Sequence, residues 1–548
     1  MTEKILMIGL DGATFDVINP LIEGGWMPNL AALIAKGASG RMLSTVPPIS
    51  GPAWLSLATG MKPESTSIYD FTYRKGDSYE LQPISSSDFA GRSIWDILGR
   101  AGKQVGILNY PMLIPPYEVN GFMSAGLWAS QDGEFTFPAD LKEELNRAAD
   151  GKYELSVNYH NSCYEDTALF LDDLERVLAK KLLAAKCLMK EKPWDFFWLV
   201  LSETDWLQHL MWRHIDRNHP LHEGRKSEKF HRRFKEVWRR IDEAIAELNV
   251  IAGEQADMFI FSDHGFGPNE EVFRLNVWLE REGYLVWRKN SNKTLSRTKS
   301  TASAWCKEVA RALRLNKIAP RLYDYGRKTK SKLIEKVVDQ IDLTRSMAFD
   351  PGHTIPFGGI YINDRLAGTA EKKRRVSREI VEKLQNWASA NGVKVETKQK
   401  CDLPVDQQSA GPDVLIGIND YRCVLLKDRF DGEVFERRPY TSRHSGSHRM
   451  DGIFIGVGPD IQNCTMDESH IYDIAPTILY LLDLPVPPSM DGQVLTTIVS
   501  EQFLSSHPVN MASETRDSES TDSVGSTKEL TQDEKDAIQR QLEDLGYM

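Results

Sequence analysis

The sequence has few cysteines, no long apolar run and no strong excess of either charge, and each shortage excludes a class of protein. Its six cysteines stand far apart and form no CxxC pair, so we expect reduced thiols rather than a disulfide framework or a structural zinc knuckle. No stretch reaches the roughly 18 apolar residues that a transmembrane helix needs. A net charge of -11 is mild for a chain of 548 residues, and it gives no general attraction to nucleic acid or to an anionic membrane.

What the sequence does contain is typical of a large globular protein. Hydrophobic residues at 41% and charged residues at 26% argue against a disordered or fibrous chain. The length predicts either one large catalytic domain with insertions or two domains. The N-terminus, MTEKILMIGLDG, has one lysine and a short apolar run, which favours a core strand over a signal peptide. We therefore expect a cytoplasmic protein.

Short apolar runs recur along the chain, and each is followed by turn residues and a helix-like segment. They occupy residues 4–10, 104–110, 196–202, 258–262 and 452–458. This alternation predicts an α/β fold with a doubly wound, mostly parallel sheet. In such sheets ligands bind beyond the carboxyl ends of the strands, so the chemistry is expected there.

Composition also predicts the domain organisation. Residues 286–345 are rich in Lys and Arg and are expected to form a basic helical insertion or cap, which favours a solvated helical excursion over a site for anions. Residues 499–530 are polar and predict a disordered linker, and residues 531–548 predict a C-terminal helix. Residues 1–285 and 346–498 are left for the catalytic domain.

Two segments pair an aspartate with a histidine directly after an apolar strand. In FIFSDHGFG, Asp263 and His264 are adjacent, so their side chains can serve two metals or one metal and its surroundings. In LSETDWLQH, Asp205 and His209 stand four residues apart, which places them on one helix face, as a zinc site requires. A turn with a satisfied histidine, or a helix-stabilising Asp/His pair, explains either segment equally well by itself.

Further ligands come from the first strand and from a late loop. Asp11 ends the first apolar run, where a lone aspartate is more often a cap or turn former. His444 and His448 precede the strand at 452–458, and either can reach inward. Together with the two Asp/His pairs, Asp11 and one of these two histidines supply six ligands for two divalent metals with open positions, the arrangement that in-line phosphoryl displacement needs.

A hydroxyl nucleophile is available in PPISGPAWLSLATG. Ser50 opens a predicted helix, whose N-terminal N–H groups and dipole would stabilise an alkoxide and phosphoryl oxygens. A simple capping serine is the alternative, and it is favoured if the metal ligands are disregarded.

These segments resemble the type I phosphodiesterase/nucleotide pyrophosphatase branch of the alkaline phosphatase superfamily. The resemblance covers residues 4–285 and 345–495 and includes MIGLDGATFDVI, SETDWLQH, SDHGFGP and SHRMDGIFIGVGP. It implies an alkaline phosphatase-like fold and hydrolysis of phosphodiester or nucleotide pyrophosphate bonds in a small phosphorylated substrate, through a phosphoseryl intermediate on Ser50. It also implies two metal sites, one held by Asp205, His209 and His448, and the other by Asp11, Ser50, Asp263 and His264. The nitrogen-rich ligand sets suit zinc, although manganese would fit the carboxylates.

The chain departs from the family at four positions at or near the nucleophile. Relatives often have Thr where this chain has Ser50, and a His-Gly pair where it has Thr66 and Ser67. Asp70 falls near the place where some relatives use Asn to touch the phosphoryl group. An acidic residue there would repel phosphate, so we do not assign Asp70 to the site.

Other functions are weighed by their residues. Trp54 stands where the sulfatase motif needs Arg, and the serine motif of cofactor-independent phosphoglycerate mutases is missing. A phosphomonoesterase of the same superfamily and a catalytically inactive binding module stay open. For a diesterase, Trp54, Trp128 and Phe357 are candidates for an apolar surface against the second ester group. Nucleic-acid association through the basic insertion is a weaker alternative, and the oligomeric state cannot be read from the sequence.

Overall fold

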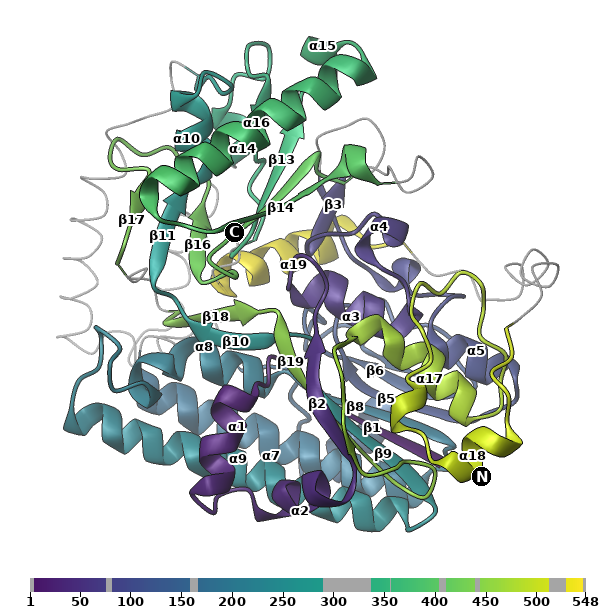
Figure 1. Cartoon of the computed structure of the whole chain (residues 1–548). Coiled ribbons are helices and arrows are strands. Elements are labelled where there is room, and N and C mark those ends of the chain that lie inside the picture. Colours follow the sequence, from purple (N-terminus) through teal and green to yellow (C-terminus); the bar gives the residue numbers. More distant parts are fainter. Residues whose placement is uncertain are drawn as a thin grey trace.

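The computed structural model describes residues 4–74, 81–157, 166–288, 337–354, 356–403, 411–438, 444–511 and 529–545. Two hydrophobic cores organise these residues (Figure 1). The larger core surrounds the central sheet, and the smaller one, which we call the second core, is built from residues between Phe273 and Val434.

The central sheet is mixed but mostly parallel, as the sequence predicts. Its order is β20-β2-β19-β9-β1-β8-β5-β6-β7, and β21 also pairs with β2. The pairings from β9 through β1, β8 and β5 to β6 are all parallel. The strands are β1 (Lys4–Leu10), β2 (Ala38–Leu43), β5 (Val105–Tyr110), β6 (Gly121–Ala125), β7 (Thr136–Phe137), β8 (Phe196–Leu201), β9 (Ala256–Phe261), β19 (Asp451–Val457), β20 (Cys464–Thr465) and β21 (Ser469–His470).

Four of the five apolar runs become neighbouring parallel strands, namely β1, β5, β8 and β9. They are almost completely buried because helices cover both faces of the sheet. The fifth run becomes β19, which lies antiparallel to both β9 and β2. The doubly wound α/β prediction is therefore confirmed, with an antiparallel strand inserted beside the parallel set.

The helices form two layers against this sheet (Figure 1). One layer contains α1 (Phe15–Glu23), α2 (Pro28–Lys36), α6 (Leu141–Ala148), α7 (Thr167–Glu191), α8 (Glu203–Ile215) and α9 (Arg225–Ala252). The other contains α3 (Ser50–Thr59), α5 (Ile94–Arg100) and α17 (Ile474–Leu481). Between the layers, the carboxyl ends of the parallel strands open toward the second core.

The second core was not foreseen by the domain boundaries drawn from the sequence, which placed residues 346–498 within the catalytic domain. It contains an antiparallel sheet of order β12-β13-β15-β14 and a second sheet of order β16-β11-β17. Its elements are α10 (Leu275–Arg281), α14 (Val337–Gln340), α15 (Asp364–Ala367), α16 (Ala370–Asn391), β11 (Glu271–Arg274), β12 (Ala348–Phe349), β13 (Gly358–Ile362), β14 (Val395–Gln399), β15 (Val414–Ile418), β16 (Cys423–Leu426) and β17 (Phe435–Glu436). The fully buried strands β13 and β15 and the amphipathic face of α16 enclose a separate set of apolar side chains here.

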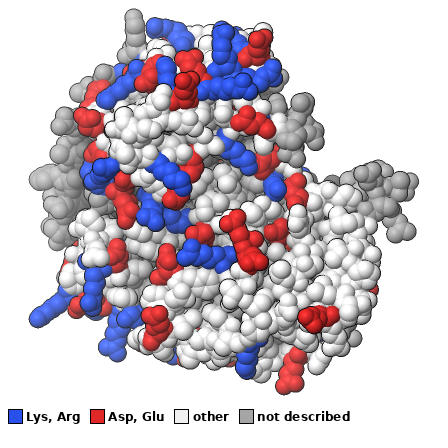
Figure 2. All heavy atoms as spheres, viewed as in Figure 1, with Lys and Arg blue, Asp and Glu red and all other residues white. Residues whose placement is uncertain are grey.

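The predicted basic insertion, 286–345, falls mostly at residues 289–336, outside the described part of the chain. Its two described ends meet, because Trp287 bridges to Ile341, and both side chains belong to the second core. Figure 2 shows basic and acidic side chains interspersed over the second core, at the top of the view.

The end of the chain differs in part from the prediction. Residues 499–530 were expected to form a disordered linker, yet residues 501–506 form helix α18 (Glu501–Ser506), whose Phe503 is buried in the main core. Residues 512–528 lie outside the described part. A helix is present where the C-terminal one was expected, α19 (Gln532–Leu545), and it packs beside β4 (Leu81–Pro83).

Four cysteines fall within the described residues, and all are free thiols: Cys187, Cys401, Cys423 and Cys464. Cys163 and Cys306 lie outside that part. Among the described helices, none is both long and apolar enough to cross a membrane.

Candidate active site

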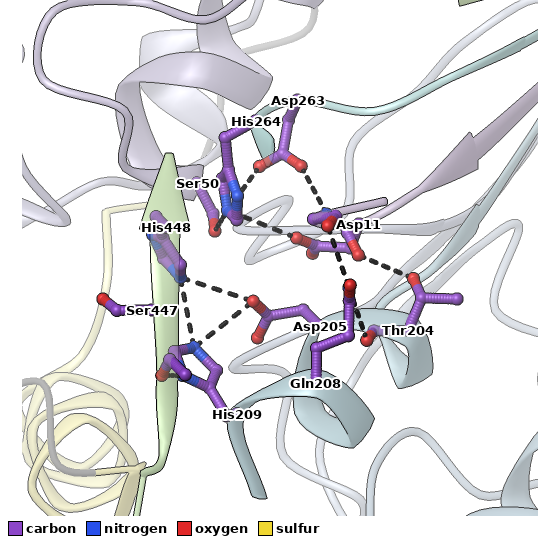
Figure 3. A network of polar contacts seen from close by, with 12 residues as sticks. Asp11, Ser50, Thr204, Asp205, Gln208, His209, Asp263, His264, Ser447 and His448 are labelled. Carbon is purple, nitrogen blue, oxygen red and sulfur yellow. Dashed lines mark hydrogen bonds and ion pairs between the residues drawn. The ribbon is translucent and has the colours of Figure 1, made fainter. Parts of the chain in front are cut away.

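The seven predicted site residues come together at the carboxyl ends of three adjacent strands, β9, β1 and β8 (Figure 3). Asp11 follows β1, Asp263 and His264 follow β9, and Asp205 and His209 lie in α8, which begins directly after β8. His448 comes from β18 (Gly446–Arg449), and Ser50 is the first residue of α3. The seven side chains are between 0 and 4% exposed, so they form one buried polar cluster.

Three histidines in this cluster are oriented in the same way. In each, Nδ1 lies within hydrogen-bond distance of a backbone carbonyl: His209 with Gly446 at 2.9 Å, His264 with Gly265 at 2.9 Å and His448 with Pro48 at 3.1 Å. A carbonyl oxygen only accepts, so Nδ1 must carry the hydrogen and donate it. Each Nε2 is then left with a lone pair directed into the cluster. This is the orientation that second-layer hydrogen bonds impose on metal-ligating histidines.

The first ligand group consists of Asp205, His209 and His448. The two Nε2 atoms are 3.1 Å apart, and each lies 3.3 Å from Asp205 Oδ1. Two lone pairs and a carboxylate oxygen at such distances repel one another unless a cation lies between them. Ligands placed about 2.0–2.1 Å from zinc at tetrahedral angles are about 3.3 Å apart, so the spacing fits that ion.

The second ligand group consists of Asp11, Asp205 and His264, whose candidate ligand atoms lie within 4.8 Å of one another. His264 Nε2 is 3.7 Å from Asp11 Oδ1 and 3.3 Å from Asp263 Oδ2. The family pattern gives Asp263 to this site, whereas the mutual distances select Asp205. Asp205 therefore belongs to both groups, and Asp263 lies beside the second group, next to His264.

Two buried carboxylate oxygens in the second group support a cation there. Within the described part of the chain, Asp11 Oδ1 and Asp263 Oδ2 make no hydrogen bond. The other oxygen of Asp263 accepts the backbone N–H of Gly12 at 3.1 Å. A buried carboxylate oxygen with no donor is costly, and a bound cation removes that cost.

The electrostatics of the cluster point the same way. Burial raises the pKa of Asp11 well above its usual value, and the neighbouring charges of Asp263 and Asp205 raise it further. Burial likewise raises the pKa of Asp263 to about 7. Burial lowers the pKa of His448 to about 3 and also lowers that of His264, so both imidazoles are neutral. Neutral imidazoles can bind a metal directly, and the raised carboxyl pKa values reflect crowded negative charge that a divalent cation would compensate.

Ser50 lies at the edge of the second group. It begins the ten-residue helix α3 after Ile49 in an extended conformation, and its side chain is 3% exposed. Its Oγ is 3.1 Å from His264 Nε2, and because that nitrogen carries a lone pair, the hydroxyl is the donor. The hydroxyl thus points at the same nitrogen that faces the carboxylates.

Two side chains that the sequence did not single out, Thr204 and Gln208, hold the turn after β1 in place (Figure 3), and Trp54 adds a contact to Asp11. Thr204 Oγ1 donates to the Asp11 carbonyl at 2.7 Å, and Gln208 Nε2 donates to the Gly12 carbonyl at 2.8 Å. Trp54 Nε1 donates to Asp11 Oδ2 at 3.4 Å. Thr204 and Gln208 stand four residues apart on α8, as Asp205 and His209 do, and each lies one residue before its counterpart. This second i, i+4 pair beside the ligand pair is the sequence signal that could have identified Thr204 and Gln208.

The two candidate histidines of the late loop have different places. His448 is in the first ligand group, whereas the ring of His444 stacks on His209 with centroids 4.4 Å apart. The structure thus places His448 with Asp205 and His209, and it places His444 behind them.

The remaining candidates make other contacts, apart from Trp54, whose Nε1 reaches Asp11. Ser67 ends the short helix α4 (Pro63–Thr66), and the Asp70 carboxylate accepts the backbone N–H groups of Phe71 and Thr354. The three aromatic residues proposed to face a second ester group are at most 2% exposed: Trp54, Trp128 and Phe357. They pack inside the main core, so they offer little open apolar surface.

The fold and this cluster together define a class of protein: an α/β protein whose strand ends gather a donor set for divalent cations beside a buried hydroxyl. The chain belongs to the type I phosphodiesterase / nucleotide pyrophosphatase family, whose model matches residues 5–413. Family membership supports hydrolysis of phosphodiester or pyrophosphate bonds as its activity.

Solved structures with a similar fold share little sequence with this chain. Phosphonoacetate hydrolase from Sinorhizobium meliloti 1021, in complex with phosphonoformate, is 15% identical with a TM-score of 0.48, over 86% of this chain and 94% of that one. Human ectonucleotide pyrophosphatase / phosphodiesterase 5 is 13% identical with a TM-score of 0.46, over 91% of this chain and 100% of that one. A search of curated proteins finds no match.

Proposed function

We propose that this protein is a two-metal phosphodiesterase that cleaves its substrate through a phosphoseryl intermediate on Ser50. One observation carries the proposal: three imidazoles that direct Nε2 inward and three buried carboxylates converge beside the Ser50 hydroxyl. In the first step a bond forms between Ser50 Oγ and phosphorus while the bond to the leaving ester oxygen breaks. In the second, water attacks phosphorus and releases Ser50.

Zinc is the metal that we propose for both sites, with manganese as the alternative for the carboxylate-rich one. Asp205, His209 and His448 would hold one ion, and Asp11, Asp263, His264 and the Ser50 hydroxyl would hold the other. When bound, two divalent cations would lower the pKa of the hydroxyl and of water and neutralise charge on the phosphoryl oxygens.

The residues of the chain contribute orientation and protection from water. The carbonyls of Gly446, Gly265 and Pro48 fix the three imidazole rings, and Thr204 and Gln208 fix the turn that follows β1. Ser50 lies at the N-terminus of α3, whose unpaired N–H groups favour an anionic oxygen. Such a fixed arrangement needs little rearrangement when the reacting groups meet.

The charge of the site favours a diester over a monoester. Three carboxylates and three neutral imidazoles carry a charge of about −3, and two divalent cations would bring about +4. While Ser50 still carries its proton, the remaining charge of about +1 balances a phosphodiester, which carries about one negative charge. A phosphomonoester carries about two at neutral pH, and its second charge would need a further cationic group.

The test compares two chromogenic esters. Purified full-length protein in zinc-containing buffer should hydrolyse bis-p-nitrophenyl phosphate with kcat/KM at least about tenfold above that for p-nitrophenyl phosphate. Ser50→Ala should lower the diester rate by about 10³-fold or more. Ser56→Ala is the matched control, because Ser56 is buried in the same helix, and its rate should stay within about twofold of the wild type.

Each alternative has its own outcome. A monoester rate equal to or above the diester rate would make the protein a phosphomonoesterase of the same superfamily. Less than one tightly bound metal per chain, together with no difference between Ser50→Ala and the wild type, would make it a binding module without this chemistry.

A further inference from the structure

Residues 63–74, which follow the nucleophile helix, lie between that helix and the second core. They comprise helix α4 and strand β3 (Thr72–Arg74), which Figure 1 shows beside β14. Glu64 pairs with Lys398 of β14, and Arg74 pairs with Asp364 of α15 at 3.5 Å. The segment therefore touches the second core at both ends, although the exposed Arg74–Asp364 pair holds it only weakly.

Asp70 fastens the middle of the segment. Its side chain is 3% exposed, and its two oxygens have separate partners: Oδ1 accepts the N–H of Phe71 at 2.7 Å, and Oδ2 accepts the N–H of Thr354 at 2.8 Å. A carboxylate can accept both bonds at once. The neighbouring Tyr69 packs so tightly on Gly411 that a Cβ there would come within 2.2 Å of its ring. Asp70 and Tyr69 thus both contact the second core.

The loop that carries Thr354 is itself held firmly. Asp350 accepts hydrogen bonds from the backbone N–H groups of Gly352, His353 and Gly359. On the far side, the buried Lys427 ammonium donates to the Phe357 carbonyl at 2.7 Å. Phe357 inserts into the main core, although its neighbours belong to the second one. A loop fixed in this way presents the Thr354 N–H at a defined position.

The same segment touches the start of the nucleophile helix. Phe71 packs against Gly51, the residue after Ser50: a Cβ on Gly51 would lie 3.0 Å from the Phe71 ring and 3.1 Å from its Cα. Since Asp70 Oδ1 accepts the N–H of Phe71, the carboxylate joins the Thr354 loop to the residue that packs against Gly51, next to Ser50.

We propose that Asp70 is a positioning residue that couples the second core to the Ser50 end of α3. The inference rests on the proposed function of Ser50. It explains why an acidic side chain can occupy a position where some relatives place Asn: the carboxylate points at two backbone N–H groups and away from phosphate. The second core therefore helps to hold the Ser50 hydroxyl in position.

The test replaces Asp70 by Asn in the full chain. An amide has one oxygen and one NH₂ group, so one of the two backbone N–H groups will face another donor. We expect kcat for bis-p-nitrophenyl phosphate to fall by roughly 10- to 100-fold, with a smaller change in KM and unchanged metal content. Amide hydrogen exchange in residues 50–55 should quicken as the helix start loosens.

Asp364→Asn is the matched control. It makes the same chemical change in the same interface, but the Asp364 side chain is 51% exposed, and its ion pairs are of the surface kind. Both kcat and hydrogen exchange should stay within about twofold of the wild type.

Two results would overturn the inference. If Asp70 instead faces the phosphoryl group, Asp70→Asn removes a repulsive charge and raises kcat. If it has no role in positioning, Asp70→Asn resembles Asp364→Asn in both measurements. Should the wild type itself hydrolyse no diester in a Ser50-dependent way, the proposed function fails, and hydrogen exchange alone decides whether Asp70 seats the start of α3.

Discussion

At the scale of single residues, the site depends on which nitrogen of each histidine carries the hydrogen. His209, His264 and His448 each use Nδ1 to donate to a carbonyl, and this directs the lone pair of Nε2 into the cluster, where a metal could accept it. The sequence could predict these residue types at strand ends. It could not predict the carbonyl partners, since Gly446 and Pro48 are more than two hundred residues away from the rings that they orient.

The choice between His448 and His444 gives a prediction at this scale. His448→Ala removes one ligand atom from the first group, so we expect affinity for zinc to fall by about 100-fold or more. His444→Phe retains a ring stacked on His209, so zinc affinity should stay within about threefold of the wild type. Competition with a chromogenic chelator measures both. If the effects of the two variants are exchanged, the assignment of His448 to the first group is wrong.

Asp70 illustrates what residue-level reasoning misses. From the sequence alone, Asp70 is left out of the site because an acidic group near the nucleophile would repel phosphate. Its partner, Thr354, is 284 positions away, and no local pattern connects the two.

At the scale of elements, helix α8 is the central part of the site, because it carries Asp205 and His209 together with Thr204 and Gln208. Its first residue, Glu203, is fully buried and forms an ion pair with Lys181 of α7 at 2.7 Å. Lys181 is also buried, and its ammonium lies 5.3 Å from the ring of Trp206. This pair joins the start of α8 to the neighbouring helix.

Breaking that pair should be costly. Lys181→Met leaves the Glu203 carboxylate buried without its counter-charge, and we expect the free energy of unfolding to fall by about 3–5 kcal/mol. The double variant Lys181→Met/Glu203→Met removes both charges and should lose less than Lys181→Met alone. Urea denaturation at a fixed zinc concentration measures the three proteins. A double variant at least as unstable as Lys181→Met alone would show that a stranded charge is not the cause.

Strand order was predictable for the parallel part of the sheet and not for β19. Four apolar runs separated by helical segments must return in the same direction, which gives β1, β5, β8 and β9. The run that becomes β19 is equally apolar, and a buried strand has the same composition in either direction. The second core intervenes between β9 and β19, and the chain re-enters the sheet at the same end where β9 leaves it, so β19 must run antiparallel to β9.

At the scale of the whole molecule, the second core is the main feature that the sequence did not reveal. Its strands are short and its long helix, α16, is amphipathic. Taken alone, each of these elements could equally well pack against the central sheet. Only the pairing of distant strands, such as β13 with β15, separates it from the main core. The described residues thus form two cores whose junction lies beside the candidate active site.

The central claim is that two adjacent cations occupy the two ligand groups beside Ser50. Anomalous diffraction at the zinc absorption edge, from crystals of the full-length protein grown with zinc, tests it most directly. We predict two peaks about 3.5–4 Å apart, one within reach of Asp205, His209 and His448 and the other beside Asp11 and His264. Peaks at other residues, or no peak at these two positions, would contradict the claim.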